Sequence, residues 1–284
     1  MANQAESSGD FNQEKVYLEN SLAISKEIED LDGISGRFTH LGLVALFEGD
    51  YQRAVSLVEQ GLEISKTTRN RWMEGWAYTD LLKINLAQGN YVEAIKYGEQ
   101  ALSIYPEGSS QLGSFVLVPL QRATWSQGDY EHSARLGREL LEVLHEFPGF
   151  KRLYPRIWLG RMALSQDNLS EAEDQLKQAL SAIEVIFKSS ENVDLLDMID
   201  FIQPFIMMFR KQGKTQQAAR LLGATDDVFE KIRLGLSPRE RSEHDEVVSS
   251  VRAELGDAAF ITAWEAGKAI TPKQAIQEIL ASPG

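Results

Sequence analysis

The densest group of side chains that could perform acid or base chemistry lies between residues 191 and 200. Its members are four carboxylates at steps of three residues, Glu191, Asp194, Asp197 and Asp200. On a helix this spacing places the carboxylates along one side, and general acid–base catalysis or calcium binding would need them to converge with further ligands. A solvated acidic helix face is the favoured interpretation, and a hydrolase that uses these carboxylates is the catalytic alternative.

The rest of the sequence lacks the motifs of known catalytic and cofactor sites. The histidines are scattered, and no two have the His-x-x-x-His spacing of a helical zinc site. The chain contains no cysteine, so it forms no disulfide, no thiolate metal site and no cysteine nucleophile. Neither a glycine-rich phosphate-binding loop nor a Gly-x-Ser-x-Gly nucleophile motif occurs. We expect no catalytic residue, no metal and no cofactor.

Composition limits the class of protein and its partners. The chain has 284 residues, of which 43% are hydrophobic and 25% are charged, as in ordinary globular proteins with a sizeable core. A formal net charge of −13 opposes contact with a phosphate backbone, so we expect no direct nucleic-acid binding. No run approaches the roughly 18 apolar residues of a membrane span, and the first residues lack the pattern of a secretion signal. We expect a cytoplasmic protein without membrane contact.

A turn motif recurs along the chain at a nearly constant interval. Its best copies, Gly49-Asp50-Tyr51, Gly89-Asn90-Tyr91 and Gly128-Asp129-Tyr130, begin 40 and 39 residues apart. Weaker copies begin at Gly9, Asp167 and Gly213. A glycine at such a turn accepts the left-handed backbone that ends a helix, and the apolar spacing between the turns is helical. Each unit is therefore predicted to be a helix, a tight turn and a second helix.

This pattern resembles the tetratricopeptide repeat family from Gly9 to about Gly223. The family's small residue seven places before the turn glycine is present as Gly42, whereas Leu82 and Gln121 replace it in the middle units. The interval exceeds the family's usual 34 residues, which predicts helices that are longer by about a turn and a half. The resemblance implies an all-α, right-handed superhelical solenoid of antiparallel helix pairs over residues 1–223, with turns near residues 9, 49, 89, 128, 167 and 213.

Residues 224–284 are predicted to form helices that cap the last repeat. Ser237 and Thr271 each precede a proline, which predicts an N-cap followed by the first residue of a helix. With Ala218–Ala224 and Leu236–Arg241, this part resembles the closing segment of the repeat or sensor regions of LuxR-type transcription regulators and STAND-type regulatory ATPases. The resemblance implies a partner such as an ATPase or effector domain that this chain does not contain.

In this family the first helix of each unit forms the concave wall of the superhelix. The wall position six places before the turn carries a cation in three consecutive units, as Lys83, Arg122 and Arg161. Equivalent residues stack along a solenoid, so we expect a basic ladder with steps of roughly 10 Å. The same wall is expected to carry Trp76, Thr79, Phe115, Trp125, Tyr154, Ile157, Gln203 and Arg210.

The basic ladder allows two interpretations. As a binding surface it would hold a protein or an acidic peptide, because arginine makes charge-assisted bonds to carboxylates. Alternatively, the cations neutralise neighbouring acidic side chains in a chain with 42 carboxylates and 29 basic groups.

The resulting hypothesis is a non-catalytic scaffold or sensor module of a bacterial-type signalling or transcription regulator, which binds a protein or peptide in its concave groove and is a monomer. The alternative within the same class is a receptor for a small molecule or signalling peptide. That alternative would require an enclosed apolar pocket around Trp72, Trp76 and the cluster Phe205–Phe209.

Overall fold

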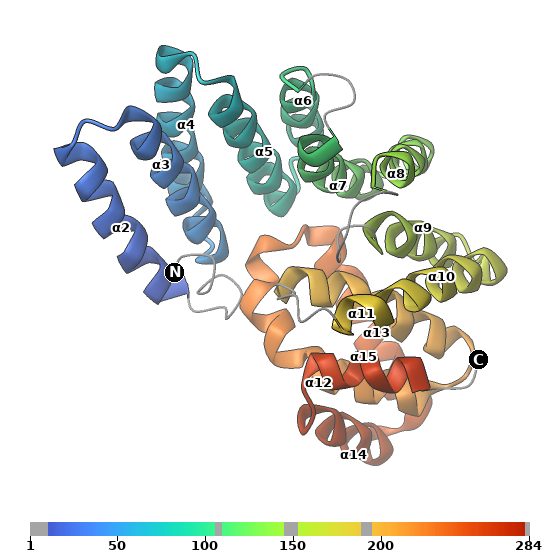
Figure 1. Cartoon of the computed structure of the whole chain (residues 1–284). Coiled ribbons are helices and arrows are strands. Elements are labelled where there is room, and N and C mark those ends of the chain that lie inside the picture. Colours follow the sequence, from blue (N-terminus) through green and yellow to red (C-terminus); the bar gives the residue numbers. More distant parts are fainter. Residues whose placement is uncertain (1–10, 106–109, 145–152, 189–194, 282–284) are drawn as a thin grey trace. The chain divides into compact units, whose positions relative to one another are not determined.

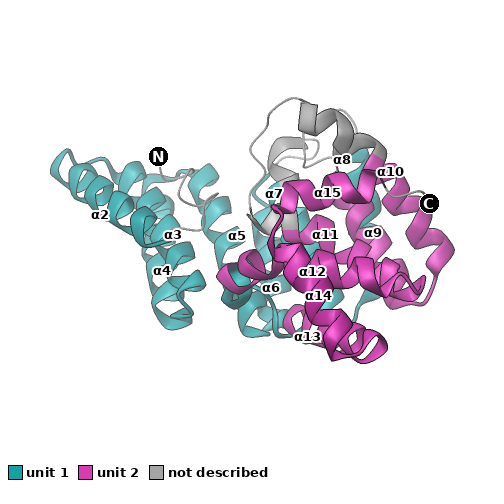
Figure 2. Cartoon of the chain, turned by 90° about the horizontal axis from the view of Figure 1, so that it is seen from below, with its two compact units in different colours: residues 1–144, 232–239 teal, residues 145–231, 240–284 magenta. Residues whose placement is uncertain are grey.

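The computed structural model describes residues 11–105, 110–144, 153–188 and 195–281 (Figure 1). In these ranges all regular secondary structure is helical and no strand occurs. The predicted all-α fold is confirmed. The chain divides into two compact units, each described by itself below (Figure 2). Unit 1 comprises Met1–Leu144 and Ile232–Arg239, and unit 2 comprises His145–Lys231 and Glu240–Gly284.

Unit 1 is built from antiparallel helix pairs that follow the turn motif. The first helix of each pair also contacts the first helix of the next pair, as α3 does with α5 and α5 with α7. The helices are α2 (Phe11–Glu27), α3 (Leu31–Phe47), α4 (Tyr51–Thr68), α5 (Arg71–Gln88), α6 (Tyr91–Leu102), α7 (Ser110–Gln127) and α8 (Tyr130–Leu144), followed much later in the chain by the short helix η2 (Arg233–Gly235).

Unit 2 continues the pairing and adds three further helices. In it, α9 pairs with α10, and α9 also contacts α11. Two of the added helices begin at Pro238 and Pro272, directly after the serine and threonine that predict helix starts. The helices are α9 (Tyr154–Ser165), α10 (Leu169–Lys188), α11 (Leu195–Lys211), α12 (Thr215–Ile232), α13 (Pro238–Leu255), α14 (Asp257–Lys268) and α15 (Pro272–Ala281). The division of the chain into repeats and a cap at residue 223 stays a prediction.

The turn motifs at Gly49 and Gly128 end one helix and start the next with two adjacent residues. Gly49 and Gly128 have φ angles of +80° and +94°, which glycine adopts without strain. The following aspartates, Asp50 and Asp129, accept hydrogen bonds from the backbone N–H groups of Arg53 and His132 and so cap the next helix. The glycine ends the first helix and the aspartate caps the second, which explains why these two residues occur together at both turns.

Small residues let the paired helices approach each other closely. The residue five places after the first residue of each turn motif is small and completely buried, as Ala54, Ala94, Ser133, Ala172 and Ala218. On the opposing helix, a Cβ at Gly42 would lie only 2.5 Å from Cγ2 of Val58. Burial of apolar surface stabilises the fold by about 25 cal/mol for each Å² removed from water. Helices packed this closely leave no room for an added methyl group.

Candidate functional site

The predicted wall residues of unit 1 form an aromatic pair and an ion pair. The rings of Trp76 on α5 and Phe115 on α7 lie 5.1 Å apart, tilted by 43°, and both are half-buried. Further along α5, the ammonium of Lys83 lies 3.2 Å from Oδ1 of Asp80. The first helices of unit 1 therefore present both aromatic surface and a cation.

Lys83 has an internal partner as well as access to solvent. Its side chain is 34% exposed, whereas that of Asp80 is 2% exposed. Burial raises the pKa of the Asp80 carboxyl, and the nearby Lys83 and His40 oppose that rise. Burial, assisted by the charge of Asp80, also raises the pKa of Tyr105 to about 12. Lys83 therefore lies beside a buried carboxylate of its own helix. This contact agrees with the interpretation that the cations of the ladder neutralise neighbouring acidic side chains.

Three other predicted residues of unit 1 are buried. Thr79 is 1% exposed, and its hydroxyl donates to the carbonyl of Gly75 one turn earlier. Arg122 is 5% exposed and Trp125 is completely buried. Their side chains therefore offer little surface to a ligand in the described conformation.

In unit 2 the cation at the wall position contacts the chain's own helix α13. The Arg161 guanidinium donates to the Glu243 carboxylate through Nε at 3.0 Å and also through a second nitrogen, and it stacks on Trp158 with Cζ 4.8 Å from the ring centre. Burial alone would lower the pKa of Arg161, but the carboxylates of Glu243, Glu240 and Asp200 outweigh it, so the pKa is raised. Arg161 is thus held in its charged form by acidic neighbours.

Two more predicted wall residues contact the same helix. Nε2 of Gln203 lies 3.0 Å from Nδ1 of His244, whose ring stacks on Phe229 at a centroid distance of 3.5 Å. Further along α13, Glu254 accepts a hydrogen bond of 3.0 Å from Nε of Arg210. From Glu243 to Glu254 these contacts extend over about 16 Å of helix. Tyr154 and Ile157 are 7% and 1% exposed and contribute to the core.

Sequence reasoning missed these partners on α13. The repeat interval locates Arg161, Gln203 and Arg210, but Glu243, His244 and Glu254 lie in a segment without repeats. The available signal was the excess of acidic over basic residues in Pro238–Leu255.

The acidic group between residues 191 and 200 does not form a solvated face at its end. Asp200 is 2% exposed, and its charge contributes to the raised pKa of Arg161, so the solvated interpretation is wrong for this residue. Glu191, Asp194 and the side chain of Asp197 lie outside the described part of the chain. Within the described ranges, no group of three or more histidine, aspartate or glutamate side chains is arranged to hold a metal ion.

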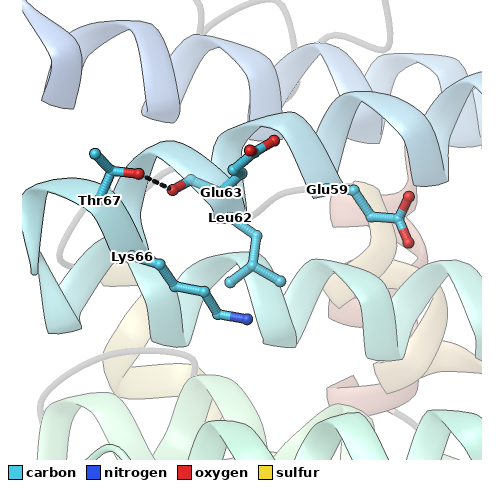
Figure 3. Close-up of a pocket in the computed structure, with 5 residues that line it drawn as sticks. All are labelled: Glu59, Leu62, Glu63, Lys66 and Thr67. Carbon is cyan, nitrogen blue, oxygen red and sulfur yellow. Dashed lines mark hydrogen bonds between the residues drawn. The ribbon is translucent and has the colours of Figure 1, made fainter.

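The surface of α4 carries a shallow depression of about 410 Å³. All of its lining residues come from this one helix, and a hydrogen bond from the Thr67 hydroxyl to the Glu63 carbonyl belongs to the helix itself (Figure 3). The lining residues are Glu59, Leu62, Glu63, Lys66 and Thr67. Trp76 is not among them, and Phe205 and Phe209 are buried in the core of unit 2, so this depression is not the predicted apolar pocket.

Comparison with known proteins agrees with the helix pairing. Residues 37–107 match the family model of the tetratricopeptide repeat. This part of the chain is similar to tetratricopeptide repeats. The match covers α3 to α6 with the start of α3 excluded, and it includes the turns at Gly49 and Gly89. No curated protein matches the chain significantly.

Solved structures of other proteins share the helical fold of this chain. The crystal structure of BtubC (BKLC) from P. vanneervenii is similar with a TM-score of 0.58 and 14% identity, over 86% of this chain and 90% of that one. A variant of the nearly identical TPR-like repeats of a putative kinesin light chain from Podosopora anserina is similar with a TM-score of 0.50 and 20% identity, over 69% of this chain and 94% of that one. At these identities the likeness concerns the fold alone.

None of the helices in the described part of the chain has both the length and the apolar composition of a membrane span.

Proposed function

We propose that this chain is a non-catalytic scaffold that binds an acidic peptide or helix of a partner protein on the wall formed by the first helices of its repeats. The observation that carries this proposal is the seat of α13 in unit 2. There, wall residues Arg161, Gln203 and Arg210 contact Glu243, His244 and Glu254 of one helix. The wall is thus of a kind that accepts a helix with acidic side chains.

The contacts have the chemistry of a recognition surface. Arginine–carboxylate hydrogen bonds are charge-assisted and roughly twice as strong as neutral ones. The wall of unit 1 adds the half-buried Trp76 and Phe115, and Trp72 on the same helix α5 is 48% exposed. Tryptophan and arginine dominate binding hot spots, so an external partner is expected to anchor on Trp76 and Phe115.

We further propose a setting for this scaffold, which is supported by the resemblance of its sequence to LuxR-type and STAND-type regulators. In that setting the chain is a cytoplasmic monomer that senses or relays a signal, and an ATPase or effector domain supplies the acidic segment. In this setting the exposed part of the Lys83 side chain contacts the partner. Arg122 is buried and helps to hold the first helices of the wall in position.

The test is a binding experiment with a variant of the aromatic pair. The immobilised chain and its Trp76→Ala/Phe115→Ala variant are exposed to extract of the source cells, and bound proteins are eluted with polyglutamate. The control is Val92→Ala on α6, whose side chain is 67% exposed and lies off the predicted wall. Circular dichroism establishes that all three are folded.

We expect a protein that the unchanged chain and the Val92 variant retain, that the aromatic variant loses, and that polyglutamate releases. Equal retention by all three chains would place binding on another surface and reject the wall as the site.

A further inference from the structure

Residues 232–239 lie against the repeats of unit 1, although the chain before and after them belongs to unit 2. This strap, defined as Ile232–Arg239, contains η2 and the first two residues of α13. It contacts α3, α5 and α7 in turn, at the ends of the helices that precede the turns at Gly49, Gly89 and Gly128. The strap therefore crosses the same structural position in three consecutive repeats.

At the first repeat the strap is held through its backbone. The hydroxyl of Tyr51 donates a hydrogen bond of 2.9 Å to the carbonyl of Leu234. A Cβ at Gly49 would lie 3.0 Å from Cδ1 of Leu234, and a Cβ at Gly235 would lie 2.4 Å from the Phe47 ring. Glycines on both sides thus permit the close approach of strap and repeat.

At the second repeat a proline occupies the same position. A Cβ at Gly89 would lie 3.0 Å from Cγ of Pro238, so a larger residue at the turn would displace the proline ring. Beside it, the hydroxyls of Ser237 and Ser126 lie 3.2 Å apart in a buried position. The strap is therefore contacted at intervals by the turn of each repeat.

At the third repeat the side chain of Arg239 is held by hydrogen bonds and by two aromatic rings. The Arg239 guanidinium donates to the carbonyls of Trp125 and Ser126 at 3.0 and 3.4 Å and to the Tyr130 hydroxyl at 2.5 Å. Its Cζ also lies 4.3 Å from the centre of the Trp125 ring and 5.3 Å from that of Tyr130. The Trp125 carbonyl also accepts a hydrogen bond from the Gly128 N–H, but carbonyls at the end of a helix carry partial negative charge, which favours a cation there. Only the planar, multiply donating arginine satisfies all of these groups together.

We propose that this edge of unit 1 is a recognition site for a short peptide segment with the pattern apolar residue, three residues, proline, arginine, and that the strap is its built-in occupant. A partner protein with a segment of this pattern displaces the strap and takes its place. Leu234 is 43% exposed and Pro238 is also exposed, whereas Ile232, Leu236 and Ser237 are buried. The strap is therefore held by these buried residues together with Arg239, and a second peptide of the same pattern can reproduce the contacts of Leu236, Ser237 and Arg239.

Apart from Trp125, which contacts Arg239, this site uses none of the predicted wall residues. It uses Tyr51, Tyr130 and the ends of the first helices, whereas the wall test uses Trp76 and Phe115. Failure of either experiment therefore leaves the other proposal standing.

The test uses a fluorescein-labelled peptide with the sequence Arg233–Glu240 and a second peptide in which alanine replaces its arginine at the Arg239 position. Binding to the full chain is measured by fluorescence polarisation for the unchanged protein and for the chain variant Arg239→Ala. If the strap is docked for about nine-tenths of the time, the unchanged chain binds the peptide about tenfold more weakly than the variant whose strap is released. We also expect the alanine peptide to bind at least about tenfold more weakly than the arginine peptide, since it lacks the cation and its donors.

Two further variants protect the test against loss of folding. Leu234→Ala removes a side chain that is 43% exposed and is expected to raise peptide binding about threefold if Arg239→Ala does not fold. Tyr51→Phe in the strap-released chain removes one hydrogen bond and should weaken binding about fivefold. Equal binding of both peptides, or no gain in binding when a folded chain loses its strap contacts, would overturn the proposal.

Discussion

Arg161 and Glu243 form an ion pair in unit 2, with side chains that are 4% and 16% exposed. Removing one partner of a buried pair leaves the other charge uncompensated, which costs far more than the pair itself contributes. The two residues are 82 positions apart, so the pair also fixes α13 on the first helix of a repeat.

The change Glu243→Gln is therefore expected to destabilise the protein by up to about 3 kcal/mol, since the carboxylates of Glu240 and Asp200 still offset part of the Arg161 charge. The exposed pair Arg252–Asp257, with side chains 51% and 75% exposed, supplies the control. Asp257→Asn should cost less than about 1 kcal/mol, because water already solvates both charges. Urea unfolding of both variants measures the difference, and equal losses would contradict the role given to Glu243.

The repeat interval predicted that Arg161 lies on the first helix of a unit, but it did not predict the contact of Arg161 with Glu243. A regular interval transfers a position from one unit to the next, so the first-helix placement of Lys83, Gln203 and Arg210 could be read from the sequence. Burial of Thr79 and Arg122 and the contacts of α13 depend on how segments distant in sequence pack together. No interval encodes those contacts, since Glu243 and Arg239 occur once, outside the repeats.

The pH dependence of stability is expected to carry a contribution from Asp80. Burial raises its pKa in the folded state above the ordinary value of 3.8. Stability from the protonated carboxyl is then fully present below pH 3.8 and is lost as the pH rises through the folded-state pKa.

The variant Asp80→Asn removes this titration. Relative to the unchanged chain, it should therefore gain stability as the pH is raised from about 3 to 7. Urea unfolding across that range gives the comparison, and Asp257→Asn, which changes an exposed carboxylate, is the control. A difference between the Asp80 variant and the unchanged chain that does not vary with pH would show that Asp80 is not buried as described.

Two glycines of unit 2 are expected to tolerate no side chain. A Cβ at Gly223 on α12 would lie 2.0 Å from the Trp264 carbonyl oxygen, and one at Gly267 on α14 would lie 2.0 Å from that of Arg220. Because these are backbone atoms, the two helices must separate to admit a methyl group. Gly223→Ala should cost about 3 kcal/mol or more.

The turn glycine Gly128 provides the comparison for Gly223. It has a φ angle of +94°, but no atom lies within 4 Å of an added Cβ. Gly128→Ala therefore suffers only backbone strain and should cost about 1–2 kcal/mol. If thermal unfolding shows the two variants to be equally stable, the close contact between α12 and α14 is not present.

The pair Arg210–Glu254 tests whether α13 is held on the wall by charge. Their side chains are 35% and 41% exposed, so the pair contributes less than about 1 kcal/mol and its loss should leave the fold intact. The change Arg210→Glu places two carboxylates together and is expected to raise hydrogen exchange in the last turns of α13. The double change Arg210→Glu/Glu254→Arg restores the attraction and should return exchange to the original rate. If the double variant exchanges as fast as the single one, complementary charge does not hold this end of α13, and the proposal that the wall selects acidic helices loses its support at that position.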